Sequence, residues 1–128
     1  MGMDIYFQAF DVNDLPLGDR QNLRGREIYS LMSRWLEERK RATPSSGERV
    51  SFESAEWEKL GPKVRVAIIE GVAELEACLR AGGKRQQRVR REGMAVEELM
   101  THAKAVAEDW MTRIWPQGTS RVEYWFTN

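Results

Sequence analysis

Histidine and cysteine, the side chains that most often carry catalysis or bind metals, are scarce in this chain. There is one of each, His102 and Cys78, whereas the usual zinc sites need three or four Cys, His or carboxylate ligands. No nucleophile signature accompanies His102, so we interpret it as a half-buried histidine that can hydrogen-bond to Glu98, four residues earlier. Cys78 lies on an apolar helical stripe and is interpreted as an unreactive core thiol. We therefore expect no catalytic residues, no metal and no cofactor.

The loop near the N-terminus has some of the oxygen ligands of a cation site. Its acidic and amide side chains are Asp11, Asn13, Asp14 and Asp19. In the EF-hand pattern the fifth position carries an oxygen ligand and the sixth a glycine, but Leu15 and Pro16 stand there. We interpret the loop as a turn, with Asp19 or Asn22 capping the helix that follows. The glycines match neither a phosphate-binding loop nor a dinucleotide fingerprint, so nucleotide hydrolysis is not expected.

The most concentrated charge lies in residues 82–93, GGKRQQRVRREG, where five of twelve side chains are basic. On a helix, a basic strip would consist of Arg80, Lys84, Arg85, Arg88 and Arg91. Such a strip could bind phosphates, although the interleaved aromatic rings of single-strand binders are absent. We favour a solvated or internally paired surface, because acidic residues flank the segment on both sides. An acidic protein partner and a nucleic acid are the alternatives.

Five tryptophans are more than a core of this size ordinarily needs. Trp35 and Trp110 lie on apolar helical stripes and are assigned to the core. Trp57 lies among charged residues, Trp115 stands at the end of a helix, and Trp125 is on the less apolar face of a strand. These last three rings are candidates for contact with a partner.

Tyr6 and Phe10 share one face of the first predicted strand, and Trp125 lies on the corresponding face of the last. If no helix covers that side of the sheet, the three rings form an exposed aromatic surface. Aromatic residues dominate the energetics of protein interfaces. A sheet covered on both sides is the alternative.

The overall composition is that of a water-soluble globular protein: 128 residues, 41% hydrophobic, 31% charged and no net charge. We expect one compact domain over residues 1–128. No segment approaches the roughly 20 apolar residues that span a bilayer, and a single cysteine requires no oxidising compartment, so we expect a cytoplasmic protein. Met1 and Gly2 lack the features of a secretion signal and could be a remnant of cloning.

Side chains alternate over residues 4–10 and again over 120–126, which predicts a strand at each end of the chain. Because an isolated short strand is marginal, we expect the two to pair with each other or to pack on helices. The fold class is therefore α+β and mostly helical, with three to four amphipathic helices and a small antiparallel or mixed sheet.

Between the strands the apolar spacing changes to that of helices. It predicts a helix over about 20–41 and a loop over 42–50. A short helix over 53–60, with Ser51 as its N-cap, and a long helix from Pro62 to Ala81 follow. The last helix ends near Ile114 and begins either near Lys84 or after Gly93.

These residues predict a small non-enzymatic binding protein that docks on another protein or macromolecular complex, of the inhibitor, immunity or adaptor type found among bacterial and phage accessory proteins. The candidate contact residues are Arg80, Lys84, Arg85, Arg88, Arg91, Tyr6, Phe10, Trp57, Trp115 and Trp125. A nucleic-acid-binding regulator that uses residues 84–91 is the alternative, and an enzyme that pairs a carboxylate with His102 ranks third. A homodimer is also considered, because the aromatic sheet face or the last helix could be self-complementary.

Overall fold

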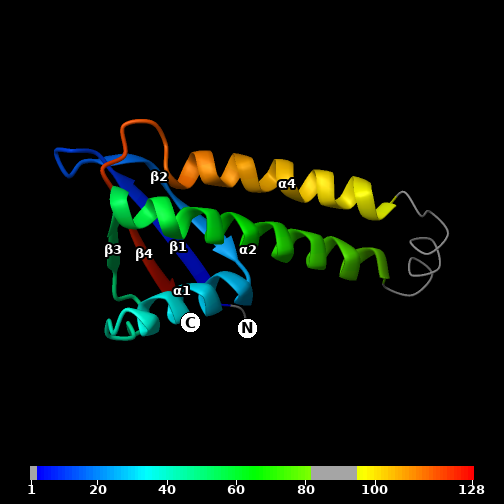
Figure 1. Ribbon diagram of the computed structural model, residues 1–128, viewed down its shortest axis with the longest axis horizontal. Helices are drawn as coiled ribbons and strands as arrows, with labels where there is room; N and C mark the ends of the chain where they lie inside the picture. The colour runs from blue at the N-terminus through cyan, green and yellow to red at the C-terminus, as the bar shows by residue number, and fades with distance from the viewer. Residues whose placement is uncertain (1–2, 82–94) are drawn as a thin grey trace.

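The computed structural model describes residues 3–81 and 95–128, without the side chains of Arg24, 73–81 and 95–96. The described elements are, in chain order, β1 (Asp4–Phe10), β2 (Pro16–Arg24), α1 (Arg26–Glu38), β3 (Val50–Glu53), α2 (Ser54–Ala81), α4 (Ala95–Ile114) and β4 (Arg121–Thr127). The fold is α+β, as predicted. Within the described residues it combines three helices with one antiparallel sheet, larger than the two strands expected, in the order β2-β1-β4-β3 (Figure 1).

The predicted pairing of the two terminal strands is confirmed. β1 and β4 are antiparallel neighbours at the centre of the sheet, with Ile5 opposite Phe126 and Phe7 opposite Tyr124. Alternation along each strand sends these four side chains to the same side, where all four are buried in the core. The ends of the chain therefore form the middle of the sheet.

β2 was not predicted, and the expected helix start near residue 20 is wrong. Pro16–Arg24 pairs with β1, and Gly25, at φ 151°, separates this strand from α1. The expected capping role of Asp19 or Asn22 is therefore also wrong, since both residues lie in β2. An edge strand has one solvated side and can be polar, and its proline and glycine gave it the signature of a turn.

The two helices predicted over 53–60 and 62–81 form one continuous helix, α2, and Ser51 belongs to β3 rather than to a helix cap. Pro62 lies inside α2, although it was expected in a first turn. A proline clashes with the Cβ of the residue before it in a helix, and here that residue is Gly61, which has none. Gly61 also lets Trp57 pack closely, because a Cβ there would come within 3.0 Å of the indole nitrogen.

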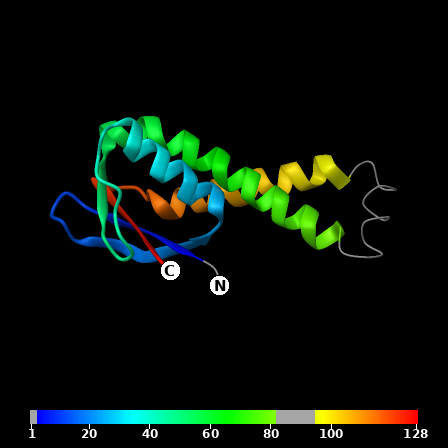
Figure 2. The ribbon, with the colours of Figure 1, turned by 90° about the horizontal axis from the view of Figure 1, so that it is seen from below.

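The helices lie on one side of the sheet (Figure 2). α2 and α4 run side by side in opposite directions and extend beyond the sheet, while α1 packs against the first half of α2 (Figures 1 and 2). Large side chains that fill the space between helices and sheet include Phe7, Phe52, Tyr124, Met32, Leu36, Leu60 and Ile114. The sheet therefore has an inner face that α1, α2 and α4 cover and an outer face that no helix of the described residues covers.

The predicted loop over residues 42–50 is held against β4, and its last residue, Val50, belongs to β3. The Gly47 N–H donates a hydrogen bond to the Phe126 carbonyl at 2.7 Å, and the Asn128 N–H donates to Ser46 Oγ at 3.2 Å. This attachment places Arg49 beside the outer face of the sheet.

Candidate functional site

Several predicted site residues fall where the structure gives no side-chain geometry. Arg80 and Cys78 lie in the part of α2 whose side chains are not described, and residues 82–94, which hold Lys84, Arg85, Arg88 and Arg91, lie outside the described residues. The start of the last helix near Lys84 or after Gly93 falls in the same range. His102 is on α4 and is exposed rather than half-buried.

Trp57 and Trp115 form a stacked pair on the helix side of the sheet. Their ring centroids are 5.6 Å apart with an interplanar angle of 8°, and the edge of Phe7 packs against Trp57. Trp57 is buried in the core, and Trp115 is half-buried against it. The expectation that these rings project from the surface is therefore wrong for Trp57, because α2 turns it inward.

Trp35 and Trp110 were assigned to the core from their helical stripes. Trp35 is buried in it, and its indole N–H donates a hydrogen bond to Glu56 at 2.8 Å. Trp110 is half-buried against the same core. The helical period thus placed both rings correctly.

The outer face of the sheet gathers Tyr6, Phe10 and Trp125, as the alternation predicted. Tyr6 and Trp125 are cross-strand partners whose rings stack with centroids 5.3 Å apart. A guanidinium lies over each of the three rings. Arg20 is 4.9 Å from the centroid of Tyr6, Arg49 is 4.1 Å from that of Trp125, and Arg121 is 4.1 Å from that of Phe10. We call these six residues the outer face.

Ion pairs hold two of these arginines in place. Glu123, on the same face of β4, accepts hydrogen bonds from Arg49 at 3.1 Å and from Arg121 at 2.7 Å, and Arg121 also donates to Asp14 at 3.1 Å. Burial would raise the pKa of Glu123, but the hydrogen bonds from Arg121 and Arg49 outweigh it, so the pKa is lowered. The carboxylate is thus kept charged by the two cations it joins.

The aromatic rings of the outer face are less exposed than the sequence suggested. Trp125 is 5% exposed and Phe10 9%, yet neither belongs to the core cluster beneath the helices. The arginines over the rings and the neighbouring strand residues cover them, so the prediction of an open aromatic surface is corrected to an arginine-covered one. The guanidinium-bearing side chains are the more accessible part, with Arg49 52% exposed.

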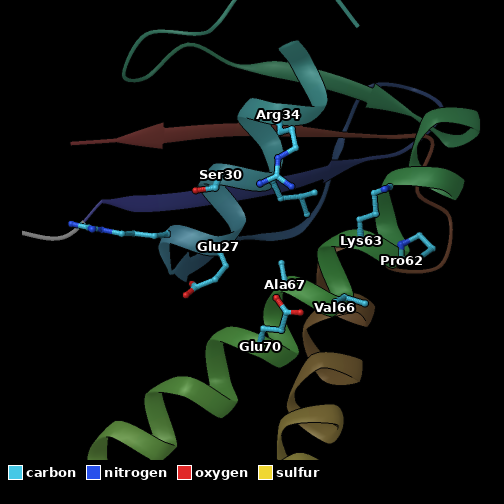
Figure 3. Close-up of a pocket in the computed structure, with 10 residues that line it drawn as sticks. Glu27, Ser30, Arg34, Pro62, Lys63, Val66, Ala67 and Glu70 are labelled. Atoms are coloured by element: carbon cyan, nitrogen blue, oxygen red, sulfur yellow. The ribbon is translucent and has the colours of Figure 1, made fainter. Parts of the chain in front are cut away.

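A groove of about 710 Å³ lies between α1 and α2 (Figure 3), and the sequence interpretation missed it. Residues from α1 on its wall include Glu27, Ser30, Leu31 and Arg34, and residues from α2 include Lys63, Val66, Ala67 and Glu70. A sequence signal was available, because each helix places a carboxylate and a cation seven residues apart. Two turns of helix bring such residues to one face.

One carboxylate of the groove sits against two glycines. Glu27 Oε2 lies 3.0 Å from the position that a Cβ on Gly25 would take and 3.4 Å from the corresponding position on Gly71. Glu27 also lines a smaller cavity of about 160 Å³ between the start of α1, α2 and α4. The lack of side chains at these glycines leaves room for the carboxylate beside α2.

In the described residues no group of three or more His, Cys, Asp or Glu side chains is placed to hold a metal ion. None of the helices in that part of the chain combines the length and apolar character needed to cross a membrane. Comparisons with protein-family models, with curated proteins and with solved structures found no match.

Proposed function

We propose that this chain is a small non-enzymatic binding protein that docks on another protein through the outer face of its sheet. The observation that supports it most is the set of three aromatic rings outside the core, each with an arginine over it. Aromatic and arginine side chains are the most frequent hot-spot residues of interfaces. None of the helices α1, α2 and α4, which make up the described helical residues, covers this face (Figure 2).

The arginines of the outer face are suited to binding because they are already positioned. A guanidinium that lies over a ring can still donate hydrogen bonds from its edge to a carboxylate. Arg49 is also held by Glu123 and is still 52% exposed. Since these contacts already restrict the arginine side chains in the unbound protein, less side-chain conformational entropy is lost when a partner binds.

The partner expected from this chemistry is a protein surface that presents carboxylates among apolar side chains. Of the three arginines on the outer face, Arg20 is the most available, because it is exposed and forms no ion pair within the described residues. The nucleic-acid alternative depends on residues 84–91, which the structure does not describe, and no described contact favours it. Trp57 and Trp115 pack on the opposite side of the sheet and are assigned to stability.

The test compares the chain with its Arg20→Glu and Arg49→Glu variants in affinity purification from the native host, followed by titration of the purified partner. We expect a stoichiometric protein partner whose affinity falls about tenfold or more in each variant, because a charge-assisted hydrogen bond contributes about 1.5–3 kcal/mol. The affinity should also weaken with added salt.

Arg113→Glu is the matched control. Arg113 is likewise an exposed arginine over a ring, that of Trp110, but it lies on α4, away from the outer face. A partner that is lost equally in this variant does not use the outer face. Recovery of nucleic acid instead of protein would favour the alternative function.

A further inference from the structure

The groove between α1 and α2 has two carboxylates toward one end and two cations toward the other, and Arg26 also lines its wall beside Glu27. On α1, Glu27 comes seven residues before Arg34, and on α2, Lys63 comes seven residues before Glu70. Because the helices run in opposite directions, Glu27 and Glu70 lie at one end while Arg34 and Lys63 lie at the other (Figure 3). The ends are two helical turns apart, which corresponds to about 10 Å along either helix.

Like charges therefore face each other across the groove. Opposite charges on facing helix surfaces attract and like charges repel, so this order does not stabilise the free protein. Exchanging the two charged residues of α2 would produce two attractive pairs from the same composition. Within the described residues, none of the four groups is in an ion pair.

The middle of the groove is apolar. Leu31 lies on the α1 side, and Val66 and Ala67 lie on the α2 side. Val66 is 48% exposed, which makes it one of the few large hydrophobic residues left open to water in the described chain. A volume of about 710 Å³ is within the range of small-molecule sites, which combine apolar walls with a few polar groups that fix the orientation of the ligand.

We propose that this groove binds a small elongated zwitterion. Its carboxylate would contact Arg34 and Lys63, its ammonium group would lie between Glu27 and Glu70, and its apolar body would cover Val66. Such a ligand neutralises both ends at once, whereas an ion of one sign neutralises one end and leaves the other unchanged. The site is separate from the outer face, so either proposal can fail without the other.

The probes are straight-chain ω-amino carboxylic acids of increasing length, titrated into the full-length protein and followed by amide chemical shifts. We expect shifts confined to residues 26–34 and 62–71, and an affinity that rises to an optimum chain length and then falls. At the optimal length, the matching monocarboxylic acid and the matching monoamine should each bind about tenfold more weakly or worse, because each lacks one charged contact.

Arg34→Gln should weaken the carboxylate contact and Glu70→Gln the ammonium contact, each by about tenfold at the optimal length. Arg113→Gln removes an exposed arginine outside the groove and should leave binding unchanged. All three positions are exposed, so the variants should fold, and their amide spectra verify it.

The proposal is overturned if no probe shifts the groove residues at saturating concentration, if affinity does not depend on chain length, or if Arg34→Gln binds as well as the unchanged protein. It is also overturned if only a helical peptide, with a glutamate and a lysine seven residues apart, occupies the groove. That result would assign the groove to a protein partner.

Discussion

The outer face of the sheet and the α1–α2 groove are both open to solvent, but they arrange their charges in opposite ways. On the outer face, Glu123 joins Arg49 and Arg121, so two of the three arginines there meet an opposite charge. In the groove, Glu27 on α1 and Glu70 on α2 lie at the same end, so like charges are neighbours (Figure 3). The ion pairs of the outer face thus contribute to the stability of the fold, whereas the four groove charges form no ion pairs within the described residues.

The same difference extends to the apolar side chains. On the outer face Trp125 is almost completely covered by its neighbours, and in the groove Val66 is about half exposed. Burial from water is the main source of stability, so substitutions on the outer face should affect unfolding more than substitutions in the groove. Substitutions in the groove should instead change the affinity for a ligand.

The largest expected effect is that of Trp125→Ala. It removes a buried ring together with its stacking on Tyr6 and its contact with Arg49, and we expect the free energy of unfolding to fall by about 3 kcal/mol. Chemical denaturation measures it. Val66→Ala in the groove should change stability by less than about 0.5 kcal/mol. Equal effects at the two positions would remove the distinction between the regions.

Glu123→Gln should have the next largest effect. It leaves Arg49 and Arg121 without their shared counter-charge, and because Arg49 is half exposed we expect a loss of only about 1 kcal/mol in unfolding free energy. Asp109→Asn is the control, since it breaks an exposed pair with Arg113 on α4 and should cost less than about 0.5 kcal/mol. A loss at Glu123 no larger than at Asp109 would show that the outer-face network is not stabilising.

The contribution of Glu123 should also depend on pH. The pKa of Glu123 in the folded protein lies below its ordinary value of 4.5, so its stabilisation is fully present above about pH 4.5. It is lost as the pH falls from there through the folded-state pKa, where the carboxylate becomes protonated. Denaturation curves of the unchanged protein and Glu123→Gln should therefore converge in acid. If the difference in unfolding free energy between the two proteins is the same at every pH, the charge of Glu123 is not its source.

Much of the outer face could be predicted from the sequence, because alternation in a strand fixes which side chains share a face. Tyr6, Phe10 and Trp125 were grouped correctly without knowledge of the sheet. Their covering could not be predicted, since Arg20 and Arg49 come from a strand and a loop that are distant in sequence. Short-range patterns carry no information on such contacts.

The sheet edges and the groove were missed for related reasons. β2 is polar and contains Pro16 and Gly18, so its local preference for a strand is weak. Its pairing with β1 stabilises it as a strand in the folded protein. Pro62 suggested a helix start, although Gly61 before it allows the helix to continue. The groove depends on how α1 and α2 pack. The seven-residue spacing of its charges predicts which charges are neighbours only when the helices are known to be antiparallel.

The smallest expected effect has the opposite sign. Combining Lys63→Glu with Glu70→Lys preserves net charge and composition but makes opposite charges face each other across the groove. We expect the unfolding free energy to rise by about 0.5 kcal/mol at low salt and the gain to vanish at high salt, as for exposed pairs. The same exchange in a Glu27→Gln, Arg34→Gln background should give no gain, because the facing charges of α1 are gone. If the exchange stabilises both backgrounds equally, the effect arises within α2, and the like charges of the two helices are too far apart to repel.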